Sequence, residues 1–205
     1  MTLMFWIDME TTGLDESGLD VPIEIGMVVT DHFGRLMGSG KWLIKDEMCQ
    51  PRIKEVRSAP DGSRDQFVRD MHRGSGLWDD QAGKTGLTTP IDLHSAELDM
   101  IEFLREHLDE YDGEGKPPLV GSSVGFDQGF LEYWFPKVYD LFHYRVIDVS
   151  TLKELCKILN PGLYARIGES TMNRKSHRVL EDLEDSVSEY MFYVDNFLFV
   201  GDEVI

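Results

Sequence analysis

The pattern of apolar and polar positions predicts an α/β protein whose chain begins with three strands. Apolar runs over residues 5–10, 21–30 and 40–44 are the expected strands, and residues 31–34 have the composition of a hairpin turn. Strands that follow one another in this way favour an antiparallel beginning of a sheet. Glu24 interrupts the second strand, and we expect it at a solvated or edge position rather than in a catalytic role.

The remainder of the chain alternates helical and strand patterns. Periodicity and capping residues predict helices over residues 63–71, 89–111, 127–135, 148–159 and 177–197, and short strands over 119–121 and 145–147. Residues 45–64, 74–88 and 160–175 lack a sustained period and are expected to be irregular. The order predicts a mixed sheet, three antiparallel strands and then parallel strands, with helices on both of its faces.

Composition indicates a single domain over residues 1–205, with residues 199–205 as a flexible tail. No apolar run approaches the ~18 residues that span a bilayer, so we expect no membrane partner. The two cysteines, Cys49 and Cys156, lack metal-site spacing, and a reducing cytoplasm is the expected location. The net charge of −18 argues against binding to long duplex nucleic acid, but a short polyanion held by cations and a few side chains is still compatible with it.

Two carboxylates stand at the end of the first strand. Asp8 and Glu10 are two residues apart, so both side chains point to the same face of the sheet. Thr11, Thr12 and Gly13 then provide turn chemistry. Neighbouring anions repel one another unless a proton or a cation lies between them, and carboxylate oxygens suit Mg²⁺ or Mn²⁺. The alternative is a strand end whose acids only face water.

Acids at two further element boundaries extend this pattern. Asp127 follows a glycine-containing turn between a strand and a helix, and His177 precedes a helix that carries Asp182. On a helical projection Asp182 flanks the apolar stripe, whereas Glu181 and Asp185 are expected on the solvated side. Four carboxylates and a histidine fit a two-metal hydrolytic centre, in which two divalent ions promote an in-line phosphoryl displacement and the imidazole accepts a proton.

The order of these motifs resembles the DEDDh family of 3′-to-5′ exonucleases, and within it the oligoribonucleases. The stretches that carry the resemblance are residues 6–15, with the motif D-M-E-T-T-G-L, and residues 71–77, 121–131, 143–155 and 176–190. The similarity covers nearly the whole chain, and the run H-Y-R-V-I-D-V-S-T-L-K-E-L is typical of oligoribonucleases. The resemblance implies a ribonuclease H-like fold, a homodimer, and hydrolysis of short RNA, especially dinucleotides, to 5′-mononucleotides.

The resemblance also implies residue roles. Asp8, Glu10, Asp127 and Asp182 would hold two Mg²⁺ or Mn²⁺ ions, and His177 would be the general base. Leu14 would wedge between or stack on the bases at the 3′ end, and Phe67 could stack on a base. His72 would either contact the substrate or have a structural role. The terminal 5′ phosphate would be contacted by Ser123, Arg145 and Ser150, with Tyr144 and Arg145 supplied by the partner subunit.

The chain departs from the family pattern at a few positions, and these bear on the substrate. Phe67 stands where a tryptophan is usual, Ser122 replaces an asparagine, and Thr11 replaces a methionine, while residues 15–21 and 202–205 have no assigned purpose. Two alternatives remain: a related exonuclease that also accepts single-stranded DNA or structured RNA 3′ ends, and a catalytically silent binding module.

Overall fold

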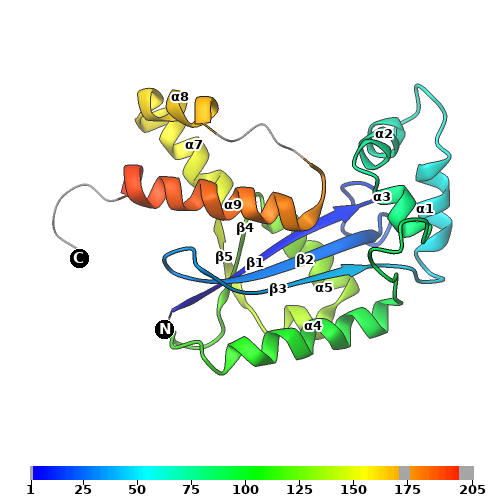
Figure 1. Ribbon diagram of the computed structural model, residues 1–205, viewed down its shortest axis with the longest axis horizontal. Helices are drawn as coiled ribbons and strands as arrows, with labels where there is room; N and C mark the ends of the chain where they lie inside the picture. Colours follow the sequence, from blue (N-terminus) through cyan, green and yellow to red (C-terminus); the bar gives the residue numbers. More distant parts are fainter. Residues whose placement is uncertain (1, 171–175, 199–205) are drawn as a thin grey trace.

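A five-stranded mixed sheet lies between two layers of helices in the computed structural model, which describes residues 2–170 and 176–198 (Figure 1). The strands are β1 (Leu3–Thr11), β2 (Pro22–Asp31), β3 (Leu36–Leu43), β4 (Pro118–Gly121) and β5 (His143–Asp148). Their order is β3-β2-β1-β4-β5, antiparallel from β1 to β3 and parallel from β1 to β5. The predicted fold class is therefore confirmed.

The helices divide between the two faces of this sheet. They are α1 (Gln50–Arg57), α2 (Gln66–Gly74), α3 (Leu77–Gln81), α4 (Leu93–Leu108), α5 (Gly125–Trp134), α6 (Pro136–Tyr139), α7 (Val149–Leu159), α8 (Pro161–Ser170) and α9 (Val179–Tyr193), with the π-helical turn η1 (Val194–Leu198) after α9. Helices α7, α8 and α9 cover one face, α4 and α5 cover the other, and α1 to α3 gather beside one end of the strands (Figure 1). None of the helices in the described ranges is long and apolar enough to cross a membrane.

Alternation along β1 explains how one strand serves both cores. Phe5, Ile7 and Met9 pack into the core beneath α4 and α5. Met4 and Trp6 pack into the core beneath α7 to α9, where the Trp6 ring lies 5.5 Å from that of Tyr190 on α9. Because side chains alternate along a strand, the next two positions of the second set, Asp8 and Glu10, also face α9.

Three helices form where irregular chain was predicted from the sequence: α1, α8 and the five-residue α3. Helix α1 buries only Ile53 and Val56, and α8 buries Leu163 and Ile167. Two buried positions give too weak a periodicity for recognition from sequence. Helix α4 begins at Leu93 rather than at residue 89, because the Asp92 side chain accepts a hydrogen bond from the Ser95 amide and caps it. The predicted tail, residues 199–205, lies outside the described residues.

Candidate active site

A cleft of about 360 Å³ lies where the parallel strands end beside the start of α9. Strand β1 supplies two acids, the β4–α5 turn and α7 supply hydroxyls, and the segment 176–189 supplies the opposite wall. The lining residues are Asp8, Glu10, Ser122, Ser123, Ser150, Lys153, His177, Asp182, Asp185, Ser186 and Glu189. The structure thus gathers four of the five predicted catalytic residues in one cleft.

The two acids of β1 differ in exposure, since Glu10 is buried and Asp8 is partly exposed, but both have raised pKa values. The Glu10 side chain is 8% exposed, and burial, followed by the charge of Asp8, raises its pKa from 4.5 to about 9. Burial also raises the pKa of Asp8 from 3.8 to about 7, with further contributions from Asp182 and Glu24. Both shifts mean that a proton or a cation is needed to offset the carboxylate charge here.

Asp127 completes the acidic group from the first turn of α5. Its residue is only 2% exposed, and burial together with the Asp8 charge raises its pKa well above the ordinary value. Its Oδ1 is buried and has no hydrogen-bond partner among the described residues. Gly121 allows this approach, because a Cβ there would lie 2.7 Å from the Ile7 carbonyl oxygen. A larger residue would force β4 and the turn that leads to Asp127 away from β1.

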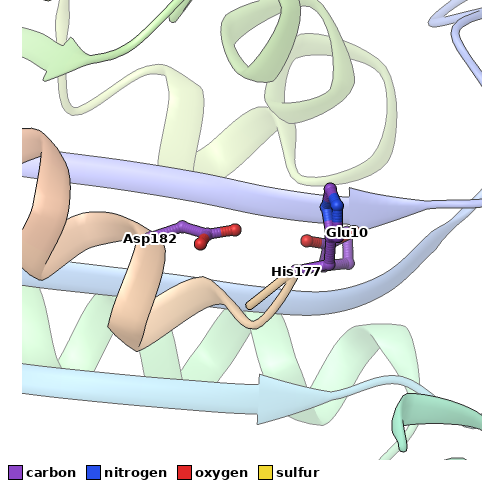
Figure 2. A group of neighbouring side chains, drawn as sticks. All are labelled: Glu10, His177 and Asp182. Carbon is purple, nitrogen blue, oxygen red and sulfur yellow. The ribbon is translucent and has the colours of Figure 1, made fainter. Parts of the chain in front are cut away.

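The segment before α9 brings the imidazole to the same place. One ligand atom each from Glu10, His177 and Asp182 can be chosen so that all three lie within 4.8 Å of one another. Figure 2 shows His177 against Glu10, with the Asp182 carboxylate directed toward them from the first turn of α9. Burial raises the pKa of Asp182, and a hydrogen bond from Ser176 (3.3 Å) and the His177 charge oppose that shift.

The donor set fits a divalent metal ion. Carboxylate oxygens are ligands that Mg²⁺ and Mn²⁺ prefer, and the unpartnered buried oxygen Asp127 Oδ1 is an unused acceptor. A bound cation would also relieve the mutual repulsion that raises the pKa values of these acids. Glu10, His177 and Asp182 therefore form a candidate metal site, and the assignment of Asp8 and Asp127 as further ligands stays a prediction.

The predicted phosphate contacts form a second feature of the cleft. The Asp148 carboxylate, which caps α7, accepts hydrogen bonds from the amides of Ser123 and Ser150, each at 2.9 Å. This bridge places the two serine hydroxyls 3.0 Å apart. On β5, Tyr144 is 68% exposed, and the Arg145 guanidinium lies 5.2 Å from the centre of its ring.

The predicted stacking residues are exposed. Leu14 is 79% exposed on the loop after β1, and Phe67 is 73% exposed on α2. Phe67 and His177 line a neighbouring hollow of about 500 Å³ together with Arg64 and other residues of the α2 region. The structure therefore brings Phe67 beside the candidate general base.

His72 lies behind the site rather than in it. Its side chain is fully buried; Nε2 is 2.8 Å from the Thr11 carbonyl oxygen, and Nδ1 is 3.5 Å from the Glu10 carboxylate. Burial lowers the pKa of His72 to about 4. This position favours the structural alternative over a contact with substrate.

Several residues of this region lie in other positions than their sequence pattern predicts. Glu24 is fully buried on β2, an interior strand, so the expected solvated or edge position is wrong. Asp185 was expected on the solvated side of its helix but lines the cleft, because α9 has a polar face turned to the site as well as an apolar stripe. Lys153 lies one helical turn after Ser150, and that spacing was a signal that could have revealed it.

No family model matches the chain, but its sequence is similar to those of several oligoribonucleases. The oligoribonuclease of Streptomyces griseus is 36% identical over 190 residues, which cover 93% of this chain and 84% of that protein. The Yersinia enterocolitica oligoribonuclease is 33% identical over 195 residues and 95% of both chains, and that of Paraburkholderia xenovorans is 32% identical over 197 residues, which cover 95% and 83%.

Solved structures of exonuclease I from E. coli share the fold. The metal-free complex with single-stranded DNA aligns with a TM-score of 0.62 at 14% identity, and the zinc-bound complex with a TM-score of 0.63 at 13%. Each alignment covers 97% of this chain and 41% of the exonuclease chain, so this chain spans about two fifths of those proteins.

Proposed function

The chain belongs to the oligoribonuclease family, and from that premise we propose that it is a 3′-to-5′ exoribonuclease of short RNA. Its products would be 5′-mononucleotides, and dinucleotides would be favoured substrates. The observation that carries the proposal is the convergence of acids from β1, α5 and α9 with His177 beside one cleft.

Asp8, Glu10, Asp127 and Asp182 would hold two Mg²⁺ or Mn²⁺ ions. When bound, such ions supply Lewis-acid chemistry, which activates water and stabilises charge on the leaving oxygen. The raised pKa values of all four carboxylates support this assignment, since each indicates a negative charge that the protein alone leaves uncompensated.

His177 would be the general base. A ring nitrogen of His177 lies within 4.8 Å of carboxylate oxygens of Glu10 and Asp182. His177 lines both the cleft and the hollow beside Phe67. Water bound between these groups can pass a proton to a ring nitrogen of His177 as its oxygen attacks the terminal phosphodiester. The bond between the phosphorus and the 3′ oxygen of the preceding nucleotide then breaks. That oxygen takes up a proton from solvent and leaves with the shortened RNA, and the terminal nucleotide departs as its 5′-monophosphate.

Substrate length would be set at the other end of the cleft. Ser123, Ser150 and Arg145 would contact the terminal 5′ phosphate of a very short RNA, with Tyr144 and Arg145 provided by the second subunit of a homodimer. Leu14 and Phe67 would stack on the bases at the 3′ end. The exposure of Leu14, Phe67 and Tyr144 supports these roles, because a stacking partner must be accessible.

The cytoplasm is the expected location. Cys49 and Cys156 are both buried free thiols, which suits a reducing compartment.

Time courses with a dinucleotide, a 5-mer and a 20-mer of RNA and with a 20-mer of single-stranded DNA, each with Mg²⁺, with Mn²⁺ and with EDTA, test this function. We expect fast hydrolysis of the dinucleotide, slow hydrolysis of the 20-mer and no turnover in EDTA. Asp127→Ala should abolish turnover, whereas Asp99→Ala, which removes an exposed acid of α4, should not. Equal rates on all three lengths, or efficient hydrolysis of single-stranded DNA, would indicate the broader exonuclease, and no turnover at all would indicate the silent binding module.

A further inference from the structure

Arg178, the residue after the candidate general base, is clamped between two carboxylates of the protein body. Its Nε and one terminal nitrogen donate to Glu24 at 3.1 and 2.8 Å, and the same terminal nitrogen lies 2.6 Å from Asp80. Glu24 is fully buried on β2, Asp80 on α3 is 4% exposed, and the Arg178 side chain is 17% exposed. A planar guanidinium held through Nε and one terminal nitrogen by two carboxylates has a fixed orientation.

This clamp is placed where the backbone needs support. The backbone of His177 has a φ of 53°, in the left-handed region that residues other than glycine rarely adopt. Such a conformation persists only when its surroundings hold it. Arg178 is the N-cap residue of α9, and the Val179 amide also points at Glu24, at 3.4 Å. The Glu24 carboxylate therefore fixes both the Arg178 side chain and the first turn of the helix that carries Asp182.

The register of the sheet places Glu24, which holds Arg178, beside Glu10. Glu10 on β1 pairs directly with Glu24 on β2, so a metal-ligand candidate and the anchor of Arg178 are cross-strand neighbours. Arg178 does not line the cleft. Its guanidinium thus acts from behind the site, on the segment that presents His177 and Asp182.

We propose that Arg178, gripped by Glu24 and Asp80, is a positioning residue that sets the orientation of the His177 imidazole. As a statement about turnover, this inference rests on the proposed function. Lys41 offers a matched control, since its Nζ lies 3.7 Å from the same Glu24 carboxylate but it belongs to β3 and, within the described part of the chain, makes no hydrogen bond or ion pair with residues 176–178. Loss of charge compensation at Glu24 would affect both variants, whereas loss of positioning would affect only Arg178.

Steady-state kinetics with a dinucleotide test the proposal through the variants Arg178→Lys and Lys41→Met. A lysine keeps the charge but cannot span both carboxylates, so kcat should fall about ten- to hundred-fold while KM changes little. Lys41→Met should leave both parameters within about twofold of the wild type. Thermal unfolding of each variant establishes that the assay temperature lies below its transition.

A double-mutant cycle gives the sharper test. If Arg178 acts through His177, then Arg178→Lys should cause no further loss in a His177→Ala background. Losses that multiply, or an equal loss of kcat in Lys41→Met, would overturn the proposal.

An NMR measurement of histidine side chains separates this inference from the proposed function. The Hε1 resonance of His177, assigned with His177→Ala, should shift in Arg178→Lys and stay unchanged in Lys41→Met, while the other five histidines keep their positions. An unshifted His177 resonance in Arg178→Lys would refute positioning, whether or not the protein hydrolyses RNA. Absence of RNA hydrolysis in the wild type would refute the function alone.

Discussion

Replacing Glu10 by glutamine should stabilise the metal-free protein at alkaline pH and remove much of its response to divalent ions. The Glu10 side chain is 8% exposed, and its pKa is raised from 4.5 to about 9, first by burial and then by the charge of Asp8. In the folded protein the carboxyl group therefore keeps its proton up to about pH 9, whereas in the unfolded chain it loses it above about pH 4.5.

The sign and size of the effect follow from this difference. A group with a raised folded-state pKa contributes stability that is complete below its ordinary pKa and is lost as the pH rises toward the folded-state value. Each titrating carboxylate changes the free energy of unfolding by about 1.4 kcal/mol per pH unit within that window. Glutamine stays neutral, so in EDTA Glu10→Gln should be more stable than the wild type by about 2 to 5 kcal/mol at pH 8 and equal to it near pH 4.5.

Urea unfolding at pH 4.5, 6, 7 and 8, in EDTA and in MnCl₂, measures these quantities. Manganese should stabilise the wild type at pH 8 by about 2.7 kcal/mol at a concentration one hundred times its dissociation constant, and Glu10→Gln by much less. Glu102→Gln, a change at an exposed acid of α4, should follow the wild-type curve under every condition. A Glu10→Gln curve parallel to that of the wild type across this pH range would refute the electrostatic reading of the site.

Three further changes test the scaffold and the substrate contacts. Gly121→Ala should lower the free energy of unfolding in urea by about 1 to 3 kcal/mol, because the new Cβ would meet the Ile7 carbonyl oxygen. Gly125→Ala is the control, since its Cβ would have no atom within 4 Å and should cost less. Equal losses of stability would contradict the close approach at Gly121. Asp20→Asn should raise KM for a dinucleotide several-fold in initial-rate assays. Asp20 accepts hydrogen bonds from Thr12 (3.0 Å) and Arg52 (2.9 Å) and so holds the loop that carries Leu14. An unchanged KM would show that this loop does not contribute to substrate binding. Phe67→Ala should raise KM about tenfold, since base stacking on an aromatic ring contributes about 1 to 3 kcal/mol. Phe67→Trp keeps an aromatic ring and should leave KM unchanged. Equal effects of the two substitutions would exclude stacking at this position.

The strand pattern allowed the fold and the carboxylate pair to be predicted because it depends on local alternation. Met4 and Trp6 identify the face of β1 that receives α9, and Asp8 and Glu10 continue the same series. Motif order then linked Asp127, His177 and Asp182 to that pair, although these residues belong to other elements. Helix α8 escaped prediction since the buried residues over 161–167, Leu163 and Ile167, leave little periodicity to detect.

The position of Glu24 shows what a local pattern cannot reveal. A charged residue within an apolar strand is expected at the solvent unless a partner is known, and its partner Arg178 lies 154 residues away. Every residue of β2 is buried, because α9 covers one face of that strand and the α4 side covers the other. Burial of Glu24 is therefore a property of the assembled layers, and only the folded chain discloses the ion pair that makes it tolerable.

The charge of the whole chain is consistent with short substrates when it is considered together with the site. A net charge of −18 disfavours any ligand whose affinity depends on counterion release along many phosphates. Lys153, a cation in the cleft wall, is paired with Glu189 at 3.3 Å, so little positive charge there is free to attract a polyanion. In the proposed function, phosphate recognition would rely on metal ions, two serine hydroxyls and Arg145 over a short span. Each additional nucleotide would bring another phosphate near an acidic surface, so the proposal favours the shortest RNA.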